Sequence, residues 1–275
     1  MNFVPLTQDQ YRAFDADGFL VIPQAISTEM VAGLTQSGDH LMESFLNDSN
    51  EPQMQLRQGI VQQEAFDPLV ANPATISLVV QLLSPNIQLH SASLIYKKPQ
   101  DPHSTPPHRG WHRDIGVAEE VGHEKPPLLG IKVCYCLTNF PAAKSGMTLM
   151  ARGSHKNAGP LAIPAGAADP PTLVDPQLKA GDAILFENRT FHTAAPNLSQ
   201  RTSKVVIYGY AYRIMKTDQY LDPPDDRVLQ RVHHDPISWQ LLGGYKNVDA
   251  RPQALIDWAE KHGVSPEPMR WTVEV

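Results

Sequence analysis

Residues 111–114 read Trp111-His112-Arg113-Asp114 and stand ahead of a run of short apolar segments. In extended backbone, side chains two residues apart point the same way, so His112 and Asp114 can both reach one ion while Arg113 points elsewhere. A His-x-Asp pair is a weak signal on its own, because the two residues fall at this spacing by chance in many surface loops. The interpretation therefore depends on the rest of the chain.

The segments on either side of this pair predict an antiparallel β protein. Five candidate strands are rich in Val, Ile, Tyr and Thr and are separated by turns that contain Gly or Pro: 87–97, 128–140, 147–150, 183–187 and 202–212. Short strands at such spacing are typical of a sandwich or barrel. Between the first two, residues 99–110 hold four prolines and a glycine, which predicts a functional loop.

Residues 1–86 predict a mostly helical covering. Thr7 and Gln10 form a capping-box pattern and Gly18 is a stop signal, so a helix is expected over 7–17, before a strand at 19–22. Further helices are expected from 27 to about 46 and over 73–83, with irregular structure and at most one strand at 47–72. Beyond 216 the chain is an extension with a helix at about 252–262. Trp239, at 236–242, fits either a helix that closes over the barrel mouth or a packing anchor.

Composition narrows the partners. With 23 basic and 29 acidic residues the net charge is −6, so we expect neither nucleic acid nor an anionic membrane as a partner. The two cysteines, Cys134 and Cys136, share one face of an expected strand, in a geometry poorly suited to a disulfide between them, so reduced thiols and a cytoplasmic location are expected. The 275 residues show no convincing boundary, which favours one domain.

The second half of the signal lies far along the chain. Gly181-Asp182 predicts a tight turn into the strand at 183–187, His192 follows that strand, and Arg201 comes nine residues later. Two imidazoles and one carboxylate are the ligand set of a non-haem Fe(II) site. If Arg201 opens the next strand, its guanidinium can pair bidentately with a carboxylate near the metal. This combination suits binding of a 2-oxo acid.

Taken together, the motifs resemble the phytanoyl-CoA dioxygenase family of Fe(II)/2-oxoglutarate-dependent oxygenases. The resemblance covers roughly residues 10–215 and rests on motifs that come in the family's order: Lys98-Pro99, Trp111-His112-Arg113-Asp114, Ser145-Gly146-Met147-Thr148, Arg152-Gly153-Ser154-His155-Lys156 and the block 180–201. It implies a double-stranded β-helix, or jelly roll, with a core at about 87–215 and helices packed outside it.

The resemblance also implies a site and a reaction. His112, Asp114 and His192 would bind Fe(II), and Arg201 would hold the distal carboxylate of 2-oxoglutarate, with O2 as the other cosubstrate. Thr148, Tyr96 and Lys98 are further candidates for contact with 2-oxoglutarate. The implied activity is oxidation, usually hydroxylation, of a small molecule, and we favour a natural-product intermediate. A carboxylate at position 114 argues against halogenation.

A different class of function stays open. A non-oxidative, cupin-like metal protein, acting as an isomerase, hydrolase or binding module, could use the same three ligands for Zn²⁺, but it would not need Arg201. We expect a monomer or a homodimer. Several neighbours of the motifs are expected to have structural roles: Trp111 in core packing, Arg113 in a salt bridge and His155 in a hydrogen bond. Arg109 is expected either to be a solvated loop charge or to contact an anionic substrate.

Overall fold

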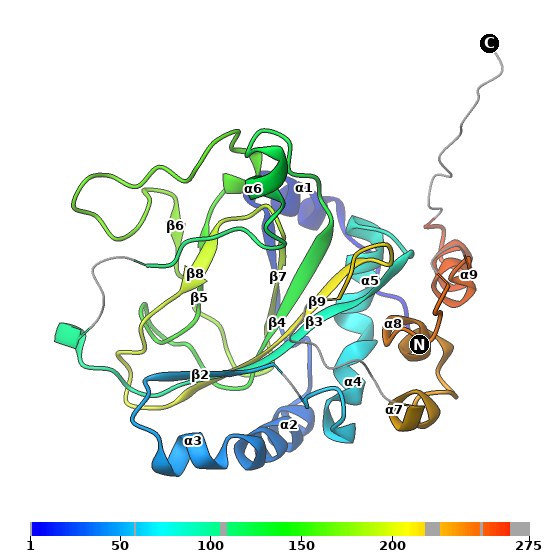
Figure 1. Cartoon of the computed structure of the whole chain (residues 1–275), viewed down its shortest axis with the longest axis horizontal. Coiled ribbons are helices and arrows are strands. Elements are labelled where there is room, and N and C mark those ends of the chain that lie inside the picture. The colour runs from blue at the N-terminus through cyan, green and yellow to red at the C-terminus, as the bar shows by residue number, and fades with distance from the viewer. Residues whose placement is uncertain (1, 58, 105–108, 218–225, 248–249, 265–275) are drawn as a thin grey trace.

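The computed structural model describes the chain except for residues 1, 58, 105–108, 218–225, 248–249 and 265–275. Two antiparallel sheets form its centre, and helices cover one side of the larger sheet (Figure 1). The six-stranded sheet has the order β1-β7-β4-β9-β3-β2 and the three-stranded sheet the order β6-β5-β8. The strands are β1 (Phe19–Ile22), β2 (Gln53–Leu56), β3 (Ile87–Lys97), β4 (Gly130–Cys136), β5 (Thr148–Ala151), β6 (Leu173–Val174), β7 (Ala183–Glu187), β8 (His192–Ala194) and β9 (Ser203–Tyr212).

Most helices come from the two ends of the chain. The α-helices are α1 (Gln8–Asp17), α2 (Thr28–Leu41), α3 (Glu43–Asp48), α4 (Asp67–Val70), α5 (Pro73–Leu82), α6 (Val117–Val121), α7 (Asp226–Arg231), α8 (Pro236–Leu241) and α9 (Gln253–Lys261). Short 3₁₀ turns occur at η1 (Glu64–Phe66), η2 (Pro102–Ser104) and η3 (Ser154–Lys156). Helices α2 to α5 and α7 to α9 lie on the side of the six-stranded sheet away from β5 and β8 (Figure 1).

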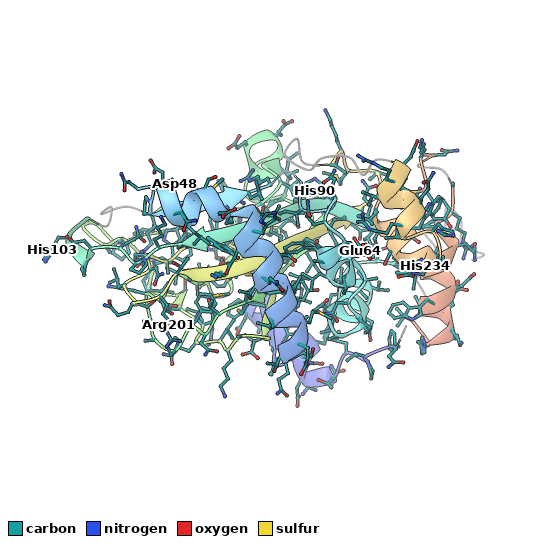
Figure 2. The ribbon with its side chains drawn as sticks, turned by 90° about the horizontal axis from the view of Figure 1, so that it is seen from below. Asp48, Glu64, His90, His103, Arg201 and His234 are labelled. Carbon is teal, nitrogen blue, oxygen red and sulfur yellow. The ribbon has the colours of Figure 1, made fainter. Side chains whose placement is uncertain are left out.

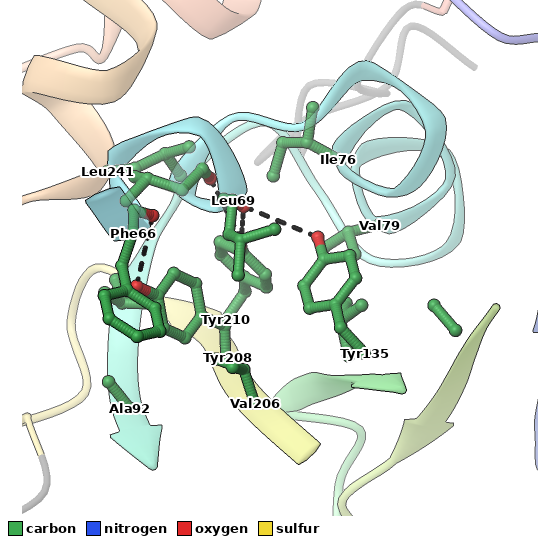
Figure 3. Close-up of a cluster of buried hydrophobic side chains, with 14 of the residues drawn as sticks. Phe66, Leu69, Ile76, Val79, Ala92, Tyr135, Val206, Tyr208, Tyr210 and Leu241 are labelled. Atoms are coloured by element: carbon green, nitrogen blue, oxygen red, sulfur yellow. Dashed lines mark hydrogen bonds between the residues drawn. The ribbon is translucent and has the colours of Figure 1, made fainter. Parts of the chain in front are cut away.

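Strand alternation divides the six-stranded sheet into two buried faces. The outer face carries Tyr135, Tyr208 and Tyr210, whose side chains join the larger apolar core beneath the helices. Their hydroxyls reach helical backbone: Tyr210 donates to the carbonyl of Val70 at 2.9 Å, and all three rings pack near α4 (Figure 3). The inner face carries residues such as Cys134 and Val205, which form a second core with residues of the three-stranded sheet and its flanking turns.

Local sequence signals predicted several elements correctly. Strand β3 has the expected bounds, and α1 begins with the full capping box at Thr7 and ends at Gly18, whose φ is +83°. Helix α5 is capped by Asn72, which accepts from the amide of Ala74 at 3.0 Å. The fold class of antiparallel sheets with flanking helices is confirmed.

Other expectations need correction. The helix expected over 27–46 is two helices, because the backbone leaves helical geometry at Met42 (φ −102°, ψ 12°), a side chain only 1% exposed. The strand expected over 128–140 is confined to β4, and the sequence patterns missed β6 and β8. Trp239 packs edge-on against Tyr245 at 5.0 Å, on a helix that contacts α4, α9 and β3, which supports the packing-anchor interpretation.

Two further observations bear on composition-based expectations. Cys134 and Cys136 are both free and buried, as predicted. None of the helices in the described ranges is both long and apolar enough to span a bilayer.

Candidate metal centre

Backbone pairing brings His112, Asp114 and His192 together. The amide of His112 donates to the carbonyl of His192 at 3.1 Å, and the amide of His192 donates back at 3.0 Å. The amide of Asp114 donates to the carbonyl of Asn188 at 2.9 Å, so the segment 112–114 is attached to the chain leading into β8. One ligand atom from each of the three side chains lies within 4.8 Å of the others. The structure therefore assembles the cluster that the motifs predicted.

Hydrogen bonds orient both imidazoles for metal binding. Nδ1 of His112 lies 2.8 Å from the carbonyl of Gly110, and Nδ1 of His192 lies 3.0 Å from the carbonyl of Thr190. Because a carbonyl only accepts, each Nδ1 carries the proton and each Nε2 keeps its lone pair. A backbone carbonyl on the far nitrogen is the usual partner of a metal-binding histidine.

Asp114 supplies an anionic ligand with one free oxygen. Its Oδ1 accepts from Nζ of Lys132 at 2.5 Å, whereas its Oδ2 is buried without a hydrogen-bond partner, 3.6 Å from Nε2 of His192. Burial by itself would raise the pKa of Asp114, but the charges of Lys132 and then His192 outweigh it and lower that pKa to about 2. Burial lowers the pKa of His192 to about 4.

The donor set fits a divalent metal ion. It consists of two imidazoles and one carboxylate, which are ligands that Fe(II) and Zn²⁺ accept; at neutral pH the His192 imidazole is neutral and the Asp114 carboxyl is ionised. A buried carboxylate oxygen without a partner is costly unless a cation binds it. His192 is buried and Asp114 half-buried, whereas His112 is exposed, so the cluster opens to solvent on the side of His112.

The loop before His112 is fixed to the segment that follows η3. Arg109 forms an ion pair with Asp169 at 2.6 Å, with the two side chains 14% and 19% exposed. The indole Nε1 of Trp111 lies 3.2 Å from the same carboxylate. The expectation that Arg109 is a solvated charge is therefore wrong, because Asp169 and the neighbouring loop cover it. Trp111 is half-buried and serves as a tether between the two loops.

Arg113 and His155 have structural roles. Arg113 points away from the metal cluster and donates to backbone carbonyls that include those of Arg189, Ser154 and Asn157. Its expected structural role is confirmed, although carbonyls replace the expected salt bridge. Nε2 of His155 lies 2.9 Å from the carbonyl of Asp15 and so connects the Gly-Ser-His segment to α1.

Of the candidates for 2-oxoglutarate contact, only Thr148 lies on the same side as the metal cluster. Thr148 pairs with Ala194, and Met150 pairs with His192 two residues away, so the side chains of Thr148 and His192 share the inner side. The hydroxyl of Thr148 also lies near the thiol of Cys134 and acts to lower the pKa of that thiol, against the larger opposite effect of burial.

Tyr96 and Lys98 point away from the cluster. The hydroxyl of Tyr96 donates to Oδ1 of Asp39 at 2.7 Å, which lies on α2. Nζ of Lys98 donates to the carbonyl of Ser49 at 2.6 Å. Strand alternation therefore places both side chains on the outer face, and Lys97 between them on the inner face, where only 4% of it is exposed.

Arg201 lies on the surface. It occupies the turn between β8 and β9, and β9 begins two residues later, at Ser203. Its side chain is exposed and lines a surface pocket with Asn139, Pro141 and Ser199, among others, and none of the three metal-cluster residues. Figure 2 shows it in the half of the molecule opposite His234. The structure does not bring Arg201 to the metal cluster.

Comparisons with known proteins agree with this geometry. The fold is similar to that of HygX from Streptomyces hygroscopicus, solved with nickel and 2-oxoglutarate, at 18% identity and a TM-score of 0.62, over 77% of this chain and 89% of HygX. It is also similar to the epimerase SnoN, solved with Fe³⁺, α-ketoglutarate and nogalamycin RO, at 16% identity and a TM-score of 0.57, over 74% and 82% of the two chains.

A third similar structure is the non-haem, α-ketoglutarate-dependent carbocyclase SnoK from nogalamycin biosynthesis, at 19% identity and a TM-score of 0.57, over 75% of this chain and 84% of SnoK. No curated protein sequence matches the chain. The sequence model of the family described as phytanoyl-CoA dioxygenase matches residues 14–205. That match spans more than half of the 275 residues and contains all three metal-cluster residues. The chain belongs to the phytanoyl-CoA dioxygenase family.

Proposed function

We propose that this chain is an Fe(II)/2-oxoglutarate-dependent dioxygenase that hydroxylates an unactivated carbon of a small molecule. The observation that carries the proposal is the cluster of His112, Asp114 and His192, with two free Nε2 atoms and a buried, unpartnered Oδ2 directed together. The cofactors of the family are Fe(II), 2-oxoglutarate and O2. The three residues would hold the iron and leave three coordination positions open.

The chain's own groups prepare the site for that ion. The two backbone carbonyls hold the imidazole rings in the metal-binding tautomer, and Lys132 occupies one oxygen of Asp114, so that a single oxygen remains for the metal. Iron held by His112, Asp114 and His192 would, with O2 and 2-oxoglutarate, supply the oxidising power for removing a hydrogen from the substrate, with succinate and carbon dioxide as the products of 2-oxoglutarate. We propose that Thr148, on β5, contacts the cosubstrate, which its position on the inner side together with His192 supports.

The substrate we propose is a natural-product intermediate. HygX has been solved with hygromycin B as well as nickel and 2-oxoglutarate, and SnoN with nogalamycin RO, so proteins of similar fold bind such molecules together with 2-oxoglutarate. The exposure of His112 gives such a molecule a route to the metal. We further propose that the two sheets form the jelly roll of one oxygenase domain, with its core at about 87–215 and the C-terminal segment as an extension.

An anaerobic titration tests the proposal. Adding Fe(II) and 2-oxoglutarate to the metal-free protein should give a visible charge-transfer band, and admitting O2 should give succinate. His112→Ala and Asp114→Ala should abolish both signals, because each removes a ligand from a three-ligand site. His234→Ala, a histidine on the far side of the sheet, serves as the matched control. Absence of the band and of succinate in the wild type would refute the proposal.

The surface position of Arg201 keeps the second candidate open. A cupin-like protein that binds Zn²⁺ without oxidative chemistry needs the three ligands but no anchor for 2-oxoglutarate, and Arg201 does not supply that anchor at the cluster. Metal analysis of protein purified without added iron, together with a 2-oxoglutarate binding assay, separates the two functions. Zinc content with no binding of 2-oxoglutarate would favour the second.

A further inference from the structure

Lys97 is a buried ammonium group on the inner face of the six-stranded sheet. It ends β3, and its partner across the strand pair is Ser203, the first residue of β9. Its Nζ donates to the carbonyl of Ala195 at 2.9 Å. Within the described ranges the ammonium group makes this one hydrogen bond. No carboxylate of those ranges lies within ion-pair distance of it. An ammonium group has three donors, so two remain without a partner.

A charge in this position is unfavourable for the fold by itself. Lysine is almost never fully buried unless it is paired. Here burial lowers the pKa of Lys97 to about 8, which leaves the ammonium charged at neutral pH. Among the described residues no carboxylate pairs with it directly, although the charge of Asp175 acts on it and partly offsets the effect of burial. A buried cation without a paired carboxylate is suited to an anionic ligand.

Neighbouring side chains connect Lys97 with the metal cluster. The charge of Lys97 acts on the thiol of Cys134, and so does the charge of Lys132, which places Cys134 close to both ammonium groups. Lys132 in turn donates to Asp114, and the hydroxyl of Thr148 lies near the thiol of Cys134 and acts on its pKa. The inner face thus runs from the metal ligands past Cys134 and Thr148 to Lys97.

The other cations of this region already have partners or lie elsewhere. Arg109 is paired with Asp169, and Lys132 is paired with Asp114. Arg201 is exposed in the turn before β9, whereas Ser203, two residues later, is 5% exposed and directly opposite Lys97. The sheet position from which β9 could extend a cation inward is therefore occupied by a serine, and the cation comes from the facing residue of β3.

We infer that Lys97, and not Arg201, binds the distal carboxylate of 2-oxoglutarate, with Thr148 and Cys134 lining the path between Lys97 and the metal. The inference rests on the proposed function, because it assumes that a 2-oxo acid binds the metal. A carboxylate at Lys97 gives the unpaired donors a charge-assisted partner. An arginine would hold this carboxylate through two hydrogen bonds of its guanidinium group. The ammonium group of Lys97 would hold it as a single, compact charge.

Equilibrium binding to Ni²⁺-loaded protein tests this without turnover. Isothermal titration measures the affinity of 2-oxoglutarate and of 2-oxobutanoate, which keeps the metal-binding end but lacks the distal carboxylate. Wild type should prefer 2-oxoglutarate. Lys97→Met should weaken 2-oxoglutarate binding about 10- to 100-fold, the range of a charged hydrogen bond, with 2-oxobutanoate and Ni²⁺ binding unchanged. The preference between the two acids should therefore disappear.

Three further variants keep the test decisive. Lys97→Arg retains a cation and should restore part of the preference, which a purely structural role of Lys97 would not predict. Arg201→Met and Lys98→Met should keep the wild-type preference. Loss of the preference in Arg201→Met, with retention in Lys97→Met, would overturn the inference and leave the proposed function intact. If wild type bound neither acid, the proposed function would fail together with it.

Discussion

Replacing Lys97 by methionine should make the protein more stable while removing an anchor for its cosubstrate. In the folded chain the pKa of Lys97 is about 8, against an ordinary value of 10.5, and burial is the main cause. At 1.36 kcal/mol per pH unit, that interval corresponds to about 3 kcal/mol of unfolding free energy lost below pH 8. The substitution also removes a donor to the carbonyl of Ala195, a loss of about 1 kcal/mol.

The expected net gain is about 2 kcal/mol at pH 7, which for a chain of this length raises the melting temperature by about 4 °C. Urea unfolding of metal-free protein without 2-oxoglutarate measures it, because a bound carboxylate would neutralise the buried charge. Lys98→Met is the matched control: the neighbouring Lys98 lies on the outer face, and its loss should lower the unfolding free energy by no more than about 1 kcal/mol.

The pH dependence of stability independently checks the sign of the predicted change in unfolding free energy. Between pH 8 and 10.5 the unfolded chain holds a proton on Lys97 that the folded chain has lost, so wild-type stability should rise with pH in this window relative to Lys97→Met. Above 10.5 both states are neutral, so the variant should lose its advantage and become less stable than wild type by about the 1 kcal/mol of the lost hydrogen bond. A variant that is less stable than wild type at pH 7, or a difference that stays constant from pH 7 to 10, would refute the reasoning.

Three other predictions concern binding and packing. Affinity for 2-oxoglutarate should be constant below pH 7 and fall above about pH 8 as Lys97 loses its proton, and isothermal titrations at a series of pH values measure this. Cys134, Arg109 and Asp175 are the other titratable or charged groups that act on the pKa of Lys97. Tyr210→Phe should lower the unfolding free energy by about 1–3 kcal/mol in urea, because the buried carbonyl of Val70 loses its donor. Gly18→Ala should lower the melting temperature markedly, because φ is +83° and a Cβ would lie 2.3 Å from Oγ1 of Thr190; an unchanged value would contradict the placement of this helix end.

Sequence patterns predicted those elements whose signals are local. The capping box at Thr7 and the alternation of β3 each identify an element from neighbouring residues, and the structure has both. Strands β6 and β8 have two and three residues, too few for an alternation to be read. The break at Met42 was missed because its residue types continue a helical pattern, whereas in the structure its backbone is non-helical and its side chain is buried.

The metal cluster and the cosubstrate anchor differ in how far sequence reasoning could reach. His112 and Asp114 share a side of any extended segment, so a single spacing indicated that they could bind one ion. To predict Lys97 as an anchor, one must know which face of β3 its side chain occupies. Tyr96, Lys97 and Lys98 are adjacent, and only the hydrogen bonds of Tyr96 and Lys98 to groups on the helical side show that Lys97 is the one that points inward. Leu94 and Ile95 point to opposite faces of the strand but are both apolar, so the sequence does not show which face is directed toward a ligand.

Once the sheet is known, the alternation of β3 also shows that Lys97 occupies a position at which an apolar residue is expected. Ile95 and Lys97 share the inner face of β3, and their partners on β9 are Val205 and Ser203. An apolar pair would fill the position of Lys97 and Ser203 at lower cost in stability, as the row formed by Ile95 and Val205 does. A cation held there without a carboxylate partner is therefore best explained by an anion that arrives from outside the chain, and the two-acid titration asks whether that anion is the distal end of 2-oxoglutarate.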